Sequence, residues 1–178
     1  LSGIFIMDYM NSQISNGIDA PAAVIAFTRC GFENDLEEFY PFGYISLMEN
    51  SKPSVTQKSF NKMLEKVLGN SKMMKKIQES ADDATKKTGS EYGIEIDAVD
   101  IDQTTLNWID ENVAIVTTRM EYVVDGELYN EFSVQGSTAL NNSIVNYYIW
   151  DVEPGLTTPN ENARILINNS KFLVRMNK

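Results

Sequence analysis

The spacing of apolar residues changes once along the chain, close to Gly89, and this change constrains the fold more than any other feature. Before Gly89, apolar residues recur every three or four positions, which is the period of one helix face. After it, apolar and polar residues alternate, which is the period of a half-buried strand. Helices followed by a run of strands predict an α+β fold, with N-terminal helices packed on one face of a curved, mainly antiparallel β-sheet.

These patterns divide residues 1–178 into three parts of one expected domain. Residues 1–18 form an N-terminal extension, residues 19–88 a helical part, and residues 92–178 the antiparallel sheet. The chain has no internal repeat and no long linker, so we expect a single hydrophobic core.

The helical part is predicted to begin with two helices. The first starts near Asp19, because Pro21 suits a first helical turn, and it contains the apolar run 22–27. A short second helix is expected over 34–40, before Pro41 and a glycine break it.

Two clearer helices follow. Ser54 and Gln57 match a capping box, in which each side chain bonds a backbone N–H of the first turn, and Gly69 is expected to end this third helix. A fourth helix is predicted over 72–87, with a thinner apolar stripe. The stripe of the third helix consists of Phe60, Met63, Leu64, Val67 and Leu68.

The alternating pattern predicts the strands. A one-residue slip in the alternation near Asp97 and Ala98 indicates a β-bulge. Residues 143–152 are apolar on both faces, which favours a strand in the middle of the sheet. Two last strands, 163–167 and 171–176, are expected to form an extra C-terminal hairpin around a turn at Asn168-Asn-Ser170.

Asp125-Gly126 predicts a hairpin turn, and two registers are open for its strands. A two-residue turn sets Met120 opposite Glu131, so the apolar faces of the two strands point in opposite directions. A three-residue bulged loop sets Val116 beside Val134 and brings the apolar faces together. Because burial of one face specifies register, we expect the bulged loop.

The absence of histidine excludes several classes of function. Without histidine there is no Ser-His-Asp or Cys-His catalysis and no His-ligated zinc or haem. A single cysteine, Cys30, excludes an internal disulfide and a multi-cysteine zinc site. We therefore expect no cofactor and no metal.

Charge and hydropathy limit the partners. The net charge of −10 opposes non-specific binding to nucleic acid or anionic lipid. No segment has the roughly 18 uninterrupted apolar residues of a membrane helix. We expect no nucleic-acid partner and no membrane span.

Three segments together resemble the nuclear transport factor 2 superfamily, the cystatin-like α+β cone. Residues 20–27 and 32–40 are similar to its Pro-led first helix and its short acidic second helix, and residues 111–135 resemble its long central hairpin. Trp150 stands where many members place a late tryptophan. The resemblance covers residues 19–152 and implies a cone-like curvature of the sheet.

Members of that superfamily include dehydratases, isomerases and epoxide hydrolases as well as non-catalytic binding domains, and the enzymes place acids and tyrosines inside the cone. The weaker polar candidates that this implies are Asp97, Arg119 and Glu121. An apolar pocket lined by aromatic side chains gives Tyr122, Tyr148 and Trp150 as ligand candidates. Arg119 and Glu121 fall on the strand face opposite the apolar stripe, so an exposed cross-strand ion pair is the simpler interpretation. No residue is assigned a catalytic role.

Three functions remain open. The first is a non-enzymatic binding or interaction domain, acting as an extracytoplasmic accessory or secretion-assembly protein. The second is a small acidic inhibitor such as a toxin-immunity protein, and the third is a histidine-free enzyme of the cone type. The partner expected for the first is another protein, with a homo-oligomer among the alternatives, because no polar group in the expected pocket is specific enough to orient a small molecule.

Overall fold

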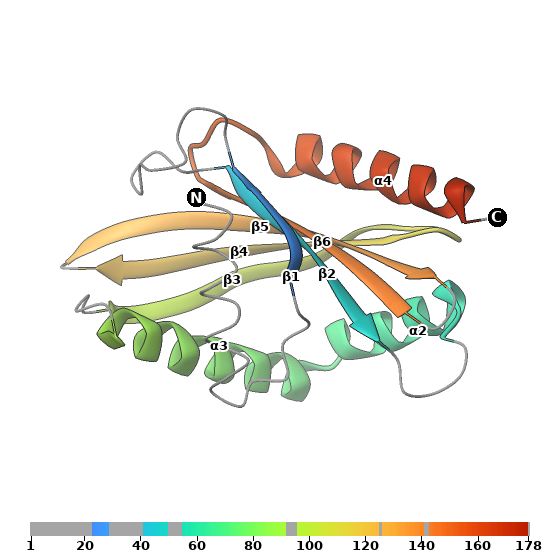
Figure 1. The fold of residues 1–178 in the computed structure, drawn as a ribbon. Helices are drawn as coiled ribbons and strands as arrows, with labels where there is room; N and C mark the ends of the chain where they lie inside the picture. The colour runs from blue at the N-terminus through green and yellow to red at the C-terminus, as the bar shows by residue number, and fades with distance from the viewer. Residues whose placement is uncertain are drawn as a thin grey trace.

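The structure is a computed structural model that describes residues 23–28, 41–49, 55–91, 96–124, 126–140 and 143–177. Within these ranges the chain forms an antiparallel six-stranded sheet in the order β1-β2-β6-β5-β4-β3, together with three helices (Figure 1). The elements are β1 (Ala23–Thr28), β2 (Phe42–Glu49), α2 (Gln57–Leu68), α3 (Ser71–Glu91), β3 (Ile96–Ile109), β4 (Ala114–Val124), β5 (Glu127–Leu140), β6 (Ser143–Val152) and α4 (Pro159–Met176). The predicted α+β class is confirmed.

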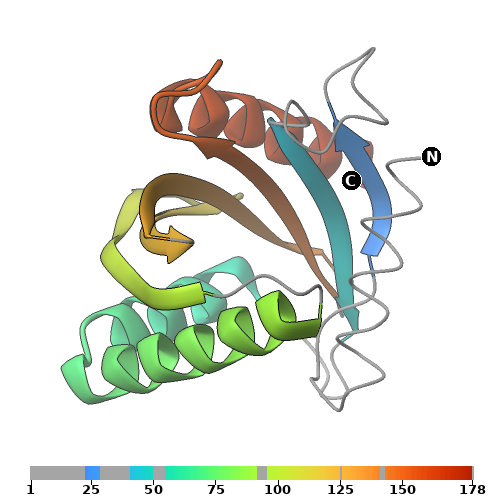
Figure 2. The same ribbon diagram turned by 90° about the vertical axis from the view of Figure 1, so that its left-hand side faces the viewer.

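Helices cover both faces of the sheet. Figure 2 shows α2 and α3 on one side and α4 on the other. On the α2 side, Phe60 packs against Ala114 and Ile144. On the α4 side, Leu166 belongs to a cluster of buried apolar side chains from β4, β5 and β6, which includes Phe132. The N-terminal helices α2 and α3 lie on one face, as predicted, but the opposite face is covered as well.

Strand β6 is one of the two middle strands of the sheet, as its two apolar faces predict. It lies between β2 and β5. Tyr147 and Ile149 join the cluster beneath α4, whereas Ile144 faces α2. Alternate residues of one strand are thus buried on opposite faces.

The predicted C-terminal hairpin is wrong, because residues 159–176 form the helix α4. Thr158 caps the helix: its hydroxyl accepts from the backbone N–H of Glu161, and the carboxylate of Glu161 accepts from the backbone N–H of Thr158. Asn168 and Asn169, predicted to form a turn, are exposed positions in the middle of the helix, and Ser170 beside them is buried.

The predicted first helix is also wrong over 23–28, which form the edge strand β1 paired with β2. A short run that is apolar throughout does not distinguish a buried helix from a strand. Both β1 and β2 therefore lie inside the segment 19–88 that the sequence predicts to be helical. The expected start near Asp19 and the short helix over 34–40 lie outside the described residues.

The third and fourth predicted helices are confirmed as α2 and α3, and α2 ends at Gly69 as expected. The capping box of α2 is shifted from the predicted pair. Thr56 and Ser59 form it, with the Ser59 N–H donating to the Thr56 hydroxyl at 3.2 Å. Ser54 lies outside the described residues, and the buried Gln57 has a different role.

Gln57 joins α2 to the sheet. Its Nε2 donates to the carbonyl oxygen of Ser137 at 3.2 Å, and its Oε1 accepts from the backbone N–H of Ala139 at 2.7 Å. The first residue of β4, Ala114, pairs with Ser137, so β5 continues past the end of its neighbour. The side-chain amide of Gln57 satisfies backbone groups there, as a peptide group of another strand would.

The register of the β4–β5 hairpin is the two-residue alternative, and the predicted bulged loop is wrong. Val124 pairs with Glu127 and Met120 with Glu131, and Gly126 has a positive φ of 79°, which suits such a turn. The prediction assumed that one face of the hairpin is buried. Both faces are covered near the middle of the sheet, so the apolar residues of β4 and β5 need not point the same way.

The predicted bulge in β3 is confirmed by a shift in its pairing with β4 between Ile96 and Ala98. Two more shifts in this pairing follow along β3. The strand continues to Ile109, beyond the segment in which apolar and polar residues alternate.

Truncation of Phe60 to alanine should lower the free energy of unfolding by about 2–5 kcal/mol, because the side chain is buried between α2 and the sheet. Met63→Ala is the matched control: the sequence pattern puts Met63 in the same stripe, but it is 54 % exposed, so the change should stay within about 0.5 kcal/mol. Equilibrium denaturation measures both, and equal losses for the two variants would contradict the assigned α2 face.

Candidate functional site

Four aromatic rings stack on the face of β2 and β6 that turns toward α2. Phe42 pairs in register with Trp150, and Tyr44 pairs with Tyr148. The ring centroids are 5.3 Å apart for Phe42 and Trp150 and 4.5 Å apart for Tyr44 and Tyr148. Tyr44 also stacks on Trp150 at 5.4 Å. We call these four side chains the aromatic stack.

The aromatic stack is partly withdrawn from water. Tyr44 is buried and the other three rings are half-buried. Burial raises the pKa of Tyr148 to about 12, since a desolvated phenolate is costly. The Tyr148 hydroxyl therefore stays protonated to a higher pH than that of an exposed tyrosine.

A buried polar row lies next to the aromatic stack. Ser46 and Asn146 are register partners, and the hydroxyl of Ser137 donates to Oδ1 of Asn146 at 2.7 Å. Within the described part of the chain, Nδ2 of Asn146 and the hydroxyl of Ser46 have no hydrogen-bond partner. Buried polar groups without a hydrogen-bond partner destabilise a fold. Ser46 and Asn146 also separate the aromatic stack from the apolar cluster around Phe60.

Tyr122, the third predicted pocket residue, lies elsewhere. It stacks on Tyr129 with centroids 5.8 Å apart, near the β4–β5 turn. Trp150 pairs in register with Ser133 of β5, and Ser133 pairs with Thr118 of β4. Thr118 is four residues from Tyr122, so Tyr122 lies roughly 13 Å further along β4. The structure brings Tyr148 and Trp150 together with Phe42 and Tyr44, but not with Tyr122.

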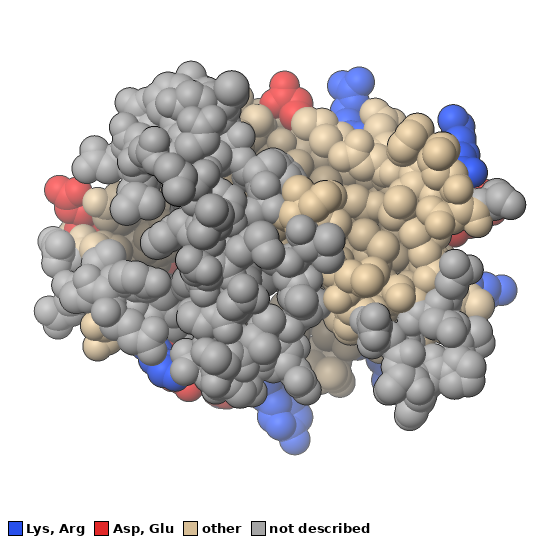
Figure 3. All heavy atoms as spheres, viewed as in Figure 1, with Lys and Arg blue, Asp and Glu red and all other residues tan. Residues whose placement is uncertain are grey.

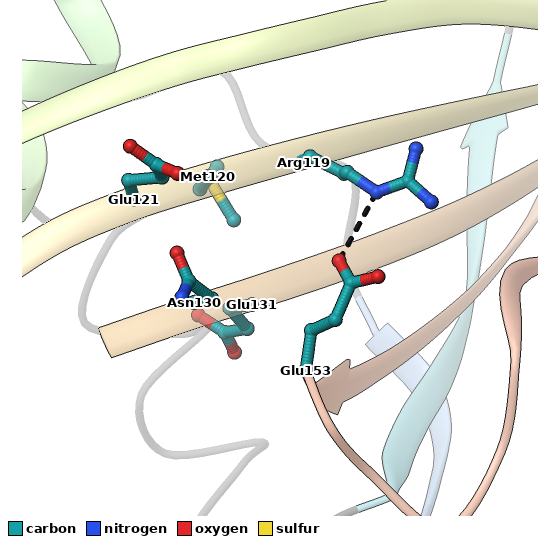
Figure 4. A pocket seen from close by; sticks show the side chains of 6 residues that line it. All are labelled: Arg119, Met120, Glu121, Asn130, Glu131 and Glu153. Carbon is teal, nitrogen blue, oxygen red and sulfur yellow. Dashed lines mark hydrogen bonds and ion pairs between the residues drawn. The ribbon is translucent and has the colours of Figure 1, made fainter. Parts of the chain in front are cut away.

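Arg119 forms an ion pair with a residue that the sequence did not suggest. Its Nε lies 3.1 Å from Oε2 of Glu153. The pair borders a hollow of about 230 Å³, and Figure 4 shows Glu121 on the far side of that hollow from the pair. Both partners of the pair are more than a third exposed, so it stabilises the fold little. The side chain of Asp97 lies outside the described residues.

The remaining residues of this hollow are Met120, Asn130 and Glu131. Among the described residues, no cluster of histidine, cysteine and acidic side chains is placed to bind a metal. Nor does any described helix combine the length and the apolar character needed to cross a membrane.

The outer side of α4 exposes large apolar side chains. Ile165 is 48 % exposed, Phe172 65 % and Met176 69 %, and Asn168 and Asn169 lie among them on the same side. We call these five residues the α4 outer face. Exposed apolar residues that gather in this way are typical of an interaction surface.

The charge of α4 differs in sign from that of the chain. The helix carries three basic residues, Arg164, Lys171 and Arg175, and one acidic residue, Glu161, on a chain of net charge −10. Figure 3 shows a largely uncharged surface over α4 and the strands beside it, with Lys and Arg side chains and some acidic ones at its margin. The α4 outer face thus combines apolar and amide side chains, and the charged residues beside it are mainly basic.

Two features extend the α4 outer face. Ile25 and Leu47 are exposed on β1 and β2, and Ile45, which pairs with Ile25 and shares its sheet face, packs against the core beneath α4. At the other end, Lys171 Nζ lies 6.0 Å from the ring centroid of the exposed Trp108. A hollow of about 490 Å³ there is lined by Asp110, Glu111, Asn112, Lys171, Val174 and Arg175.

The sequence pattern does not predict the α4 outer face, because it favours two strands, 163–167 and 171–176, around a turn. A signal for the helix is present: Thr158 followed by Pro159 and Glu161 is the pattern of a capping box with proline at the first helical position. The sequence pattern does not predict a site at Phe42 and Tyr44 either, because Pro41 and the following glycine indicate only the end of a helix there.

No protein-family model matches the chain, and no curated protein sequence is significantly similar to it.

The raised pKa of Tyr148 predicts how stability depends on alkaline pH. The pKa is 10.0 for an unfolded tyrosine and about 12 for Tyr148 in the folded protein. The contribution of Tyr148 to the free energy of unfolding is therefore complete below pH 10.0 and is lost as the pH rises toward about 12. Tyr148→Phe should make the decline of the free energy of unfolding shallower between pH 10 and about 12. Denaturant titrations at several pH values measure this, and parallel declines would contradict the assigned burial.

Proposed function

We propose that this chain is a non-enzymatic interaction domain that binds another protein through the α4 outer face. The observation that carries the proposal is the exposure of Phe172, Ile165 and Met176 on one side of a helix whose opposite side is packed on the sheet. Aromatic and methionine side chains and arginine are enriched in protein interfaces. Phe172, Met176 and Arg175 supply all three on the last turns of α4.

The aromatic stack supports a binding pocket less well. Its rings use their faces to stack on one another, so those faces are not free to hold a planar ligand. The two hollows described above are instead lined mostly by charged and amide side chains. A ligand pocket is normally apolar with a few polar groups that converge. An interaction domain agrees with the non-catalytic members that the resemblance to the α+β cone implies.

A photo-crosslinking residue at position 172 tests this function. Benzoylphenylalanine in place of Phe172, in cells that naturally make the protein, should give a covalent adduct with one protein that mass spectrometry identifies. The matched control carries the same residue in place of Lys75, whose side chain is 78 % exposed on α3. The α4 assignment fails if position 172 gives no adduct, or the same adducts as position 75.

A further inference from the structure

We infer that the protein bound at the α4 outer face is a second copy of this chain, with the two α4 helices packed antiparallel about a twofold axis near Asn168 and Asn169. This inference rests on the proposed function and names its partner. Three properties of α4 support it: the arrangement of its charges, the spacing of its exposed residues and the size of the surface.

The charges of α4 match those of an antiparallel copy. Its first turn contains Glu161 and its last turn contains Arg175. Antiparallel packing brings Glu161 of each copy close to Arg175 of the other, at both ends of the interface. Parallel packing would instead set like charges against each other. Opposed helix dipoles favour the same arrangement.

The exposed residues have the spacing of a helix–helix seam. Ile165, Asn169, Phe172 and Met176 follow one another at intervals of four, three and four residues, the pattern with which two helices interlock. A twofold axis between Asn168 and Asn169 sets Ile165 of one copy against Phe172 of the other. The asparagine amides then meet at the centre, where each can donate and accept, and polar pairs of this kind fix helix register.

The surface suits a weak, closed dimer. An 18-residue helix is about 27 Å long, so α4 alone offers less than the roughly 800 Å² per partner of a standard interface. The exposed Ile25 and Leu47 lie on the same side of the sheet and add apolar area. Because a twofold interface uses the same patch on both copies, association stops at two.

Sedimentation of the purified chain between about 1 and 200 µM tests the dimer, because we expect an interface of this size to dissociate in the micromolar range. We expect the weight-average mass to rise from that of a monomer toward that of a dimer. Phe172→Ser should weaken the dimer about 30-fold or more, as loss of a central aromatic side chain does. Met73→Ser removes an exposed apolar side chain from α3 and should leave the dimer unchanged.

Disulfide trapping tests the orientation. In a Cys30→Ala background, Asn169→Cys should form an inter-chain disulfide, because residue 169 lies beside the axis. Met176→Cys should not form a disulfide, although residue 176 lies two turns further along the same side of the helix. Antiparallel packing keeps residue 176 of one copy about 20 Å from residue 176 of the other, beyond the limit of roughly 7 Å between the Cα atoms of a disulfide. Cross-linking of both variants would overturn the antiparallel arrangement.

The two proposals fail separately. A chain that stays monomeric over the whole concentration range overturns the dimer, as does a dimer that Phe172→Ser leaves intact. If position 172 then gives an adduct with a different protein, the interaction domain stands and only the second copy is excluded. If it gives no adduct and no dimer forms, both proposals fail.

Discussion

Burial on both faces of the central strands is the constraint on which the rest of the structure depends. Ile115 and Phe132 are buried on the α4 side, while Ala114 and Ile144 are buried on the α2 side. A sheet covered on one face only would favour the register that aligns the apolar faces of β4 and β5. With two covered faces, the two-residue turn at Gly126 still leaves Phe132 and Ala114 buried on opposite faces, while Leu128 beside the turn is exposed. A helix covers each face where the burial is complete (Figure 2).

The junction between β6 and α4 fixes which side of α4 meets water. The buried Asp151 accepts from the backbone N–H of Thr157 at 2.8 Å and from its hydroxyl at 2.6 Å, and that hydroxyl accepts from Asn162 at 2.9 Å. A Cβ at Gly155 would collide with Asp151, so the loop can pass this closely only with glycine there. With Asn162 and Leu166 held inward, Phe172 points outward.

Sequence patterns predicted elements whose signal is local, and they failed where tertiary contacts decide. The apolar residues around Phe60 recur with the spacing of a helix face, and a strand could not place them all on one face. The helix α2 was therefore predictable from the sequence. The run 22–27 has no period, and only its pairing with β2 makes part of it a strand. In α4, the turn-forming residues Asn168 and Asn169 misled the prediction, although the cap at Thr158 outweighs them. Tyr148 and Trp150 could be placed on one strand face, but not the rings of β2 that stack on them.

The composition of the α4 outer face favours specific binding over aggregation. Aggregation-prone surfaces expose continuous apolar runs without charge. Here Asn168 and Asn169 interrupt the apolar side chains, and Arg164 and Lys171 lie two turns apart along one flank of them, with stems that can cover apolar surface while their charged ends stay in water. A second α4 satisfies both the apolar and the amide groups, whereas an unmatched apolar surface would leave the amides without partners. In the proposed dimer, the same asparagines that interrupt the apolar side chains would therefore select the surface that α4 binds.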